Sequence, residues 1–298
     1  WEYDKAVVDE VNTLSTNQRY LEGLSLSRKV VATTDMQAFF REVDIVFVTL
    51  PSRFVKRVIA PHASQVSGQL PFVNMSKGIE EETGETVFQQ LSALFPHNPL
   101  AMVAGPSLAN EFSRGVFTAV VAASEHIWLV EKVRQLMSNL RFAVVASEDA
   151  IGVELGGILK NIYALGMGLF DQRTDKGMNL VGAYLTQSLK EMTLLGVAMG
   201  ASPGSFTNLS GVGDLITTAM SEHSHNQKMG RLVASQMPIE SIRKEMGVLP
   251  EGYNTVRVAL KQAARLQLDL PLASLIYRAV NDNLGVDDFL DEFSGILA

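Results

Sequence analysis

The spacing of apolar residues changes near residue 150, and this change constrains the fold more than any other feature of the sequence. Before that point, short apolar runs rich in β-branched residues alternate with helical segments. The run from Asp44 to Leu50 is continuous, which is typical of a strand buried on both faces of a parallel sheet. Beyond residue 150 the spacing is helical throughout. We therefore predict an α/β domain with a parallel sheet at 1–149 and an all-α domain at 150–298.

The alternation also predicts where the individual elements lie. We expect strands at 30–32, 44–50, 72–77, 101–104, 118–123 and 142–146. Helices are expected at 4–22, 33–42 with its cap, 53–67, 86–94 and 128–139, and then at 151–170, 180–199, 205–221, 225–236, 238–245, 252–266 and 271–282. Open α/β sheets bind ligands at the carboxyl ends of their strands, so we look for functional residues there.

Charge and composition exclude several classes of protein. A formal net charge of −7 and a pI near 5.3, without a Lys/Arg cluster, argue against a nucleic-acid-binding protein. The sequence has no cysteine, which excludes disulfides, thiolate metal sites and cysteine nucleophiles and favours a cytoplasmic location. The longest apolar runs fall far short of the roughly 20 residues that a membrane helix needs, so we expect no membrane insertion.

Lys160 is the only cation between Ile151 and Ala164, a stretch predicted to be helical. Gly156 and Gly157 precede it by four and three positions and share one helical face with it. A helical side chain leans towards the helix N-terminus, which places the ammonium over two glycines that leave room for a ligand and little water. Such desolvation lowers the pKa of a lysine towards the range useful for proton transfer. The alternative is a lysine whose stem crosses a core helix to reach water.

Three polar positions follow predicted strands. Lys77 ends the strand at 72–77, where its charge suits a phosphate group, although a solvated loop lysine is the alternative. Gly105 permits close approach of the backbone, and Ser107 offers a hydroxyl near a helix start, where anions are stabilised. Plain N-capping by Ser107 would explain the same residue without a function.

Two further groups lie in the predicted all-α part. Asp214 follows a Gly-Val-Gly sequence and suits hydrogen bonding to a substrate hydroxyl, although a turn is the alternative. Ser224, His225 and Asn226 offer three kinds of donor at a predicted helix start, which suits a phosphate or a simple capping turn. No metal site is expected, since His223 and His225 have no supporting cluster. The sequence also lacks a G-x-S-x-G elbow, a P-loop and a G-x-G-x-x-G turn.

The order of these motifs is more specific than any one of them. Eight motifs follow one another along the chain: Asn17-Gln-Arg-Tyr-Leu21, Thr34-Asp35, Ser76-Lys77-Gly78, Ala104-Gly-Pro-Ser107, Leu159-Lys160-Asn161, Gly211-Val-Gly-Asp214, Asn226 with Gly230, and Glu251-Gly252. In this order they resemble the motifs of the NAD(P)-dependent glycerol-3-phosphate dehydrogenases, and the resemblance runs from Trp1 to about residue 285.

This resemblance implies a Rossmann-like dinucleotide-binding domain at 1–149, a helical substrate domain at 150–298, and reversible hydride transfer between dihydroxyacetone phosphate and sn-glycerol 3-phosphate. Lys160 would be the general acid that protonates the carbonyl oxygen, and the base in reverse. The residues implied to bind the phosphate substrate are Lys77, Gly105, Ser107, Asp214, Ser224, His225 and Asn226. Those implied to bind the cofactor are Ala109, His225, Leu249 and Glu251.

The sequence departs from the family in three places. The family's first strand, G-x-G-x-x-G turn and first helix are not in the chain, and Trp1 matches a position just after the second strand. Loss of two strands would expose an apolar sheet edge, so we expect the sequence to be an incomplete record. His225 and Gln187 each stand where the family usually has arginine, which predicts weaker phosphate binding or reliance on another cation.

The acidic stretch Glu2-Tyr3-Asp4 replaces the family's basic residue that would suit a 2′-phosphate, so NAD is expected rather than NADP. Two alternatives to a glycerol-3-phosphate dehydrogenase supplying phospholipid synthesis stay open at this point. One is a related β-hydroxyacid or phosphogluconate-type dehydrogenase with a similar two-domain plan. The other is a catalytically silent paralogue that binds glycerol phosphate. The sequence leaves the oligomeric state open, with a homodimer as one option.

Overall fold

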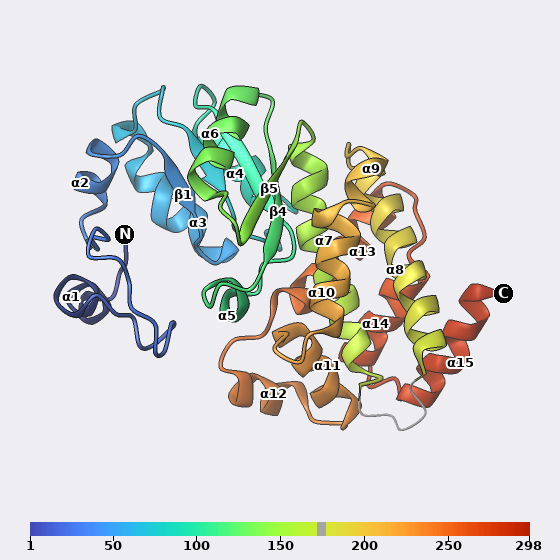
Figure 1. Ribbon diagram of the computed structural model, residues 1–298. Coiled ribbons are helices and arrows are strands. Elements are labelled where there is room, and N and C mark those ends of the chain that lie inside the picture. The colour runs from blue at the N-terminus through green and yellow to red at the C-terminus, as the bar shows by residue number, and fades with distance from the viewer. Residues whose placement is uncertain (172–176) are drawn as a thin grey trace.

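The computed structural model describes residues 1–171 and 177–298 and consists of a sheet-containing part joined to a helical part (Figure 1). The five strands lie side by side in the order β1-β2-β3-β4-β5. Their bounds are β1 Val46–Val48, β2 Phe72–Asn74, β3 Leu100–Ala104, β4 Thr118–Ala123 and β5 Phe142–Ser147. β1 pairs with β2 and β2 with β3 in parallel, in the register Val46 to Phe72 and Phe72 to Leu100. The predicted buried strands are therefore present, and most of their pairings are parallel.

One pairing differs from the parallel arrangement that the sequence favours. β4 runs antiparallel to β3, with Met102 opposite Ala123, and β5 then lies parallel to β4. The connection between β3 and β4 contains only the short helix α5, Ala109–Phe112. A parallel return needs a crossover long enough to cross the whole sheet, whereas this connection stays near the end of β3. The apolar pattern of a strand reports its burial and not its direction.

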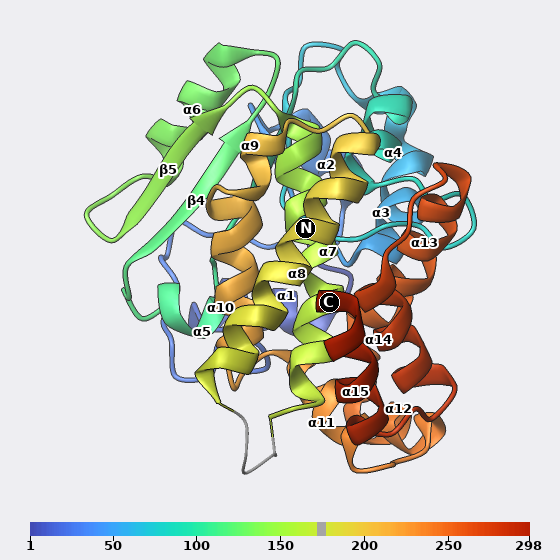
Figure 2. The same cartoon turned by 90° about the vertical axis from the view of Figure 1, so that its right-hand side faces the viewer.

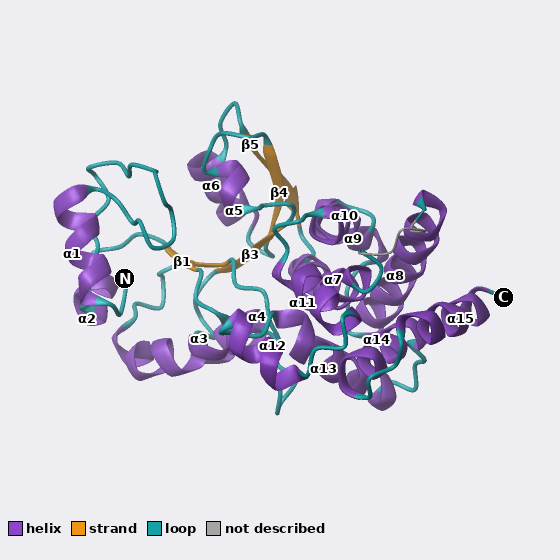
Figure 3. Ribbon diagram, turned by 90° about the horizontal axis from the view of Figure 1, so that it is seen from below, coloured by secondary structure: helices purple, strands orange, loops and turns teal. Residues whose placement is uncertain are grey.

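Helices cover both faces of the sheet (Figure 3). The helices that precede or connect the strands are α1 Lys5–Leu14, α2 Met36–Arg41, α3 Ser52–Ile59, a 3₁₀ helix at Ala60–Gln65, α4 Val87–Leu94, α5 and α6 Ile127–Met137. α6 packs on one face through Leu129, Val130 and Val133. On the other face α3 and α4 pack against β1 and β2, where Phe72 stacks on Phe95 with ring centroids 4.4 Å apart. Strands β1 to β4 are thus largely buried, as uninterrupted apolar strands require, whereas β5 at the edge of the sheet keeps exposed residues.

The helical part is built around α7, Ala150–Gly168. The helices after it are α8 Met178–Ala198, α9 Pro203–Phe206, a π-helix at Leu209–Gly213, α10 Asp214–Met220, α11 His225–Ala234, α12 Ile239–Met246, α13 Glu251–Arg265, α14 Pro271–Asn281 and α15 Val286–Leu297. α7 contacts α8, α10, α11, α13 and α14 on one side and β3 and β4 on the other (Figures 1 and 2). Every residue of α7 from Gly152 to Gly168 is buried. This helix is therefore the shared core of the two parts.

No helix among residues 1–171 and 177–298 has both the length and the apolar character needed to cross a membrane. α7 is long and buried, but the residues that cover it are other helices and the sheet.

Three expectations about individual elements are wrong, and one helix has no counterpart among the predicted elements. Residues 30–32 form no strand, because the backbone of Ala32 pairs with the Asn12 side chain, at 2.8 and 2.9 Å, instead of with another strand. α1 ends at Leu14 rather than near residue 22, since Ser15 adopts a left-handed conformation with φ 55°. The helix expected at 205–221 is divided by the π-helix, and α15 was missed although Phe289 and Phe293 give it a buried face.

Candidate active site

Lys160 lies on α7, in the middle of the shared core. Asp149 precedes the helix, and its carboxylate caps it by accepting from Gly152 N at 2.8 Å. The same carboxylate accepts from Ser202 N and from the Ser205 hydroxyl. The side chain of Lys160 is only 8% exposed. Burial lowers its pKa to about 8, with Asp214 opposing the shift and Lys77 reinforcing it. The predicted desolvation of this lysine is confirmed, and the lysine does not reach out to solvent.

The two glycines before Lys160 have a different role from the one expected. A Cβ at Gly156 would lie 2.6 Å from the carbonyl oxygen of Ser210, and one at Gly157 would lie 3.1 Å from Ala104 Cβ. These glycines therefore let the π-helix and the end of β3 approach α7, and they do not leave an open space for a ligand. The prediction of ligand room is wrong because a sequence cannot show which neighbour fills the space beside a glycine.

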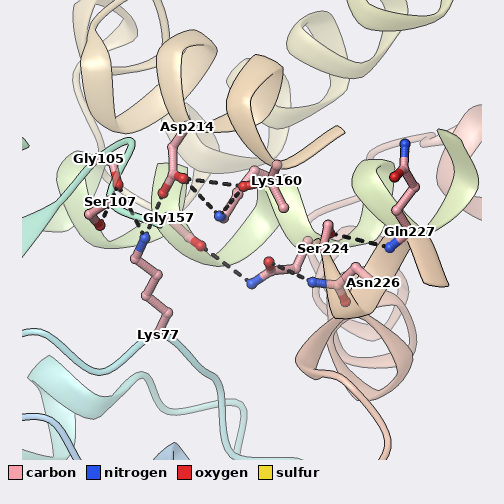
Figure 4. Close-up of polar contacts among 11 residues, drawn as sticks. Lys77, Gly105, Ser107, Gly157, Lys160, Asp214, Ser224, Asn226 and Gln227 are labelled. Atoms are coloured by element: carbon pink, nitrogen blue, oxygen red, sulfur yellow. Dashed lines mark hydrogen bonds and ion pairs between the residues drawn. The ribbon is translucent and has the colours of Figure 1, made fainter. Parts of the chain in front are cut away.

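Asp214 joins Lys160 to a second lysine (Figure 4). Its Oδ1 accepts from Lys160 Nζ at 2.8 Å and its Oδ2 accepts from Lys77 Nζ at 2.6 Å. Burial of Asp214 would raise its pKa, but the two ammonium groups outweigh burial and leave the pKa below its usual value. Asp214 is thus an ionised, almost fully buried counter-ion shared by two lysines, and not a turn residue.

The first turn of α10 completes the surroundings of Lys160. Thr218 lies one turn after Asp214, and its hydroxyl bonds both to Lys160 Nζ and to Asp214 Oδ1, the latter at 3.3 Å. The ammonium is therefore held by a carboxylate and a hydroxyl from one helix. Thr218 was missed from the sequence, although its spacing of four from Asp214 places both side chains on one helical face.

Lys77 and the turn after β3 lie opposite Lys160. The Lys77 side chain is 23% exposed and also donates to Gly105 O at 3.4 Å. Gly105 has φ +144°, and a Cβ there would lie 3.0 Å from the Cα of Val120, so this backbone position requires glycine. Ser107 donates to Gly105 O at 2.9 Å, while the N-cap position of α5 is Leu108. Ser107 is therefore not a capping residue, and Lys77 is not a freely solvated lysine.

A chain of amides extends from α7 towards α11 (Figure 4). Asn161 accepts from Asn226 Nδ2 at 2.9 Å. Asn226 Oδ1 accepts in turn from Gly252 N at 2.9 Å. Ser224 caps α11 by accepting from Gln227 N at 3.3 Å, so its capping interpretation is confirmed. Asn161 is a second residue of the site that was not singled out beforehand, although it is part of the Leu159-Lys160-Asn161 motif.

His225 stands apart from this network. It lies at the first position of α11 between two buried residues, yet its own side chain is exposed. Gln187 is the other position at which the family usually has arginine. It is buried and donates to Glu191 Oε1 at 3.0 Å. Glu191 in turn accepts from the backbone at the start of α14, so Gln187 belongs to a helix–helix contact.

The residues implied to bind a cofactor are divided between two places. Leu249 and Glu251 line a cleft of about 770 Å³, together with Ser52 and Arg53 at the start of α3. Ser52 donates to Glu251 Oε1 at 3.1 Å, and burial raises the pKa of Glu251. Ala109 is exposed at the start of α5. Ser52 follows β1, so this cleft lies at the carboxyl edge of the sheet and has the size of a small-molecule site.

The fold and the site together define a class of protein. An α/β sheet with a cleft at its carboxyl edge, next to a helical part that supplies a buried lysine, is the architecture of a two-domain dehydrogenase. The comparison with known proteins gives the family. Residues 1–129 match the family model for the N-terminus of NAD-dependent glycerol-3-phosphate dehydrogenase, and residues 149–291 match the model for its C-terminus. The chain belongs to this family.

Individual proteins agree with this assignment. The chain is 35% identical over 274 residues to the glycerol-3-phosphate dehydrogenase [NAD(P)+] of Pseudomonas syringae pv. tomato, covering 92% of this chain and 80% of the relative. The crystal structure of the glycerol-3-phosphate dehydrogenase of Coxiella burnetii superposes with a TM-score of 0.90 at 26% identity, over 98% of this chain and 89% of that chain. The resemblance drawn from the ordered motifs is therefore confirmed, and the β-hydroxyacid or phosphogluconate-type alternative is set aside.

Proposed function

We propose that the protein catalyses the reversible reduction of dihydroxyacetone phosphate to sn-glycerol 3-phosphate with a nicotinamide cofactor, and so supplies glycerol phosphate for phospholipid synthesis. Membership of the family supports the reaction. The observation that carries the chemistry is the buried Lys160 ammonium, held by Asp214 and Thr218 beside a second cation, Lys77.

Lys160 serves as the general acid of ketone reduction. When bound, the nicotinamide group supplies the hydride that the carbonyl carbon accepts. Lys160 gives its Nζ proton to the carbonyl oxygen, which becomes the hydroxyl of the product, and takes the proton back in the reverse direction. A pKa of about 8 suits both directions near neutral pH, because a proton-transfer group works best near the operating pH.

Lys77 binds the negatively charged substrate. Its ammonium is the more exposed of the two that Asp214 holds, and it lies next to the turn of Gly105 and Ser107. Ser224, His225 and Asn226 add a hydroxyl, an imidazole and an amide at the start of α11, where backbone N–H groups favour an anion. Asp214 orients both lysines, which differs from the direct contact with a substrate hydroxyl that the sequence suggested.

The cofactor residues are Leu249 and Glu251, which line the cleft at the edge of the sheet, together with the exposed Ala109 at the start of α5 and His225 at the start of α11. The cleft volume of about 770 Å³ and its apolar and polar lining fit part of a dinucleotide. We propose NAD over NADP because Glu2 and Asp4 place carboxylates in the segment that leads to α1. Asp4 is held there by capping α1 and by an ion pair with Arg19 at 3.1 Å. In the same terms, residues 1–149 form the dinucleotide-binding domain and residues 150–298 form the substrate domain, although Lys77 of the first contributes to substrate binding and Glu251 of the second contributes to cofactor binding. The enzyme acts in the cytoplasm.

The direct test is an assay of the purified protein with dihydroxyacetone phosphate at millimolar concentration and either NADH or NADPH. We expect oxidation of NADH, with a higher kcat/KM for NADH than for NADPH. Absence of turnover with both cofactors would contradict the proposed reaction, and a preference for NADPH would contradict the choice of NAD alone.

A catalytically silent paralogue that binds glycerol phosphate is the second candidate. The observation that favours it is the exposed His225, whose imidazole offers fewer hydrogen-bond donors to a phosphate than the arginine usual in the family. Titration calorimetry separates the two proposals. Binding of sn-glycerol 3-phosphate without turnover would identify a binding protein, whereas binding with turnover would identify the enzyme.

A further inference from the structure

Glu154 is a buried carboxyl group that the proposed chemistry does not use. It lies on α7, six positions before Lys160, and is 2% exposed. Its Oε1 accepts from Phe88 N, at the start of α4, at 2.8 Å and from Asn74 Nδ2, at the end of β2, at 3.2 Å. The Thr86 hydroxyl also bonds to it, and burial raises its pKa to about 7. All three donors are neutral groups, so this carboxyl depends on hydrogen bonds to offset its desolvation.

The Asn74 side chain connects Glu154 to the turn that carries Lys77. Asn74 Oδ1 accepts from Ser76 N at 3.0 Å, and Asn74 Nδ2 donates to Ser76 O at 3.3 Å as well as to Glu154. Ser76 itself donates to Leu50 O at 2.6 Å, which ties the turn to the end of β1. The amide of Asn74 therefore shapes the turn immediately before Lys77, and Glu154 fixes the orientation of that amide.

Lys77, at the tip of the same turn, is connected to α7 through Asp214. Lys77 Nζ bonds to Asp214 Oδ2, and Asp214 Oδ1 bonds to Lys160 on α7. Gly157 lies between Glu154 and Lys160, and a Cβ there would be 3.6 Å from Cδ and Cε of Lys77. The stem of Lys77 thus runs along the surface of α7. α7 thus holds the base of this turn through Glu154, while at its tip Lys77 bonds to Asp214 of α10, which bonds in turn to Lys160 of α7.

We propose that Glu154 is a positioning residue: through Asn74 it fixes the turn that carries Lys77, and thereby places the substrate-binding ammonium relative to the acid–base ammonium of Lys160. The inference rests on the proposed function of the two lysines. It assigns to Glu154 an effect on substrate binding that exceeds its contribution to packing, since small displacements of a positioned group reduce catalytic efficiency strongly.

The test compares two substitutions of Glu154. Glu154→Met keeps a side chain of similar length but removes the acceptor, and we expect KM for dihydroxyacetone phosphate to rise by about tenfold with kcat within about threefold. Glu154→Gln keeps an oxygen that accepts from Phe88 N and Asn74 Nδ2, so KM should return to within about twofold of wild type. Asn74→Ala removes the connection while leaving Glu154 bonded to Phe88 N, and it should raise KM as Glu154→Met does.

Glu191 provides a matched control. It is also 2% exposed, lies on a neighbouring helix, and accepts from backbone N–H groups at the start of a further helix, Leu272 N at 2.7 Å and Ala273 N at 3.0 Å. Glu191→Met should lower the melting temperature as Glu154→Met does, but it should leave KM unchanged. A double variant Asn74→Ala/Glu154→Met should raise KM no further than either single variant, because both act through one contact.

The outcomes separate this inference from the proposed function. An active wild type whose KM is unchanged in folded Asn74→Ala and Glu154→Met, or rises equally in Glu191→Met, would overturn the positioning role alone. A wild type without turnover would overturn the reaction, and calorimetric titration with sn-glycerol 3-phosphate would then make the same comparison through Kd. A wild type that neither turns over nor binds would overturn both.

Discussion

Lys77 and Lys160 share one carboxylate but lie in different surroundings. Lys160 is carried by a buried helix, is 8% exposed, and bonds to a carboxylate and a hydroxyl. Lys77 is carried by a turn at the end of a strand, is 23% exposed, and bonds to the other oxygen of Asp214 and to a backbone carbonyl. The same charge and the same partner are therefore placed in two environments, one in each part of the molecule.

The difference in burial explains how two lysines can have different roles, proton transfer for Lys160 and phosphate binding for Lys77. Burial brings the pKa of Lys160 to about 8, so its ammonium is able to lose and regain a proton near neutral pH. Lys77 keeps part of its surface exposed beside the Gly105 turn, where a phosphate can approach. Removal of Lys160 should therefore affect kcat, whereas removal of Lys77 should affect KM.

The largest effect is expected from Lys160→Ala. Loss of a positioned proton donor should lower kcat by at least about 10²-fold, with a smaller change in KM. Steady-state kinetics of NADH oxidation, with circular dichroism as a control for folding, would measure this. Turnover within about threefold of wild type would show that Lys160 is not the acid–base group and would remove the distinction between the two lysines.

Asp214→Asn should affect both lysines. The carboxylate raises the pKa of Lys160 against burial, so its neutralisation should move that pKa below about 8. Reduction of the ketone needs the protonated ammonium, so the wild-type rate is fully present below about pH 8 and falls as the pH rises through it. In the variant this fall in rate should occur at lower pH, and kcat at pH 8 should therefore be about tenfold lower than in wild type.

The pH dependence of kcat in both directions would measure this shift. The oxidation of sn-glycerol 3-phosphate needs neutral Lys160, so in wild type it should rise through the same range in which reduction falls. If the pH at which kcat for reduction falls were the same in Asp214→Asn as in wild type, the Asp214 carboxylate would not control the protonation of Lys160.

Lys77→Met should raise KM for dihydroxyacetone phosphate by about tenfold, corresponding to about 1.4 kcal/mol of binding free energy, with little change in kcat. Methionine preserves the apolar stem that lies along Gly157 but removes the charge. Initial-rate kinetics at several substrate concentrations would give both constants. A fall in kcat as large as that of Lys160→Ala would mean that the two lysines act as one catalytic unit.

His225→Arg should have the smallest effect, a decrease of about threefold in KM. Arginine offers bidentate donors to a phosphate at the start of α11, where imidazole offers no such pair. Calorimetric titration with sn-glycerol 3-phosphate would confirm that the change lies in binding. Unchanged affinity would count against any phosphate contact at this position.

Much of the fold was predictable because buried strands and helices have local patterns. The strands at 44–50, 72–77 and 118–123 were found from continuous apolar runs, and the structure places β1, β2 and β4 within them. Residues 30–32 have the same local pattern but form no strand, since strand formation also requires a partner. The antiparallel direction of β4 depends on the path of its connection, which no local pattern records.

The candidate site was predictable to a similar degree. Lys160 was singled out from its neighbours along one helix, and its lowered pKa follows from burial that the surrounding apolar residues already indicated. Its contact with Asp214 joins positions 54 residues apart, and that of Lys77 with Asp214 joins positions 137 apart. No spacing in the sequence specifies such contacts, because they depend on how α10 and the turn after β2 pack against α7.

The sequence by itself determined the change from alternating strands and helices to helices alone, the family, and the residue types that carry charge at strand ends and helix starts. These features are local, since each depends on periodicity or on residues close in the chain. Only the tertiary structure decided that Asp214 is a counter-ion shared by two lysines, that Gly156 and Gly157 admit protein rather than ligand, and that Glu154 reaches the turn of Lys77 through Asn74. Those roles arise from packing between distant segments, and burial at such a contact sets both the strength of a hydrogen bond and the pKa of the group that makes it.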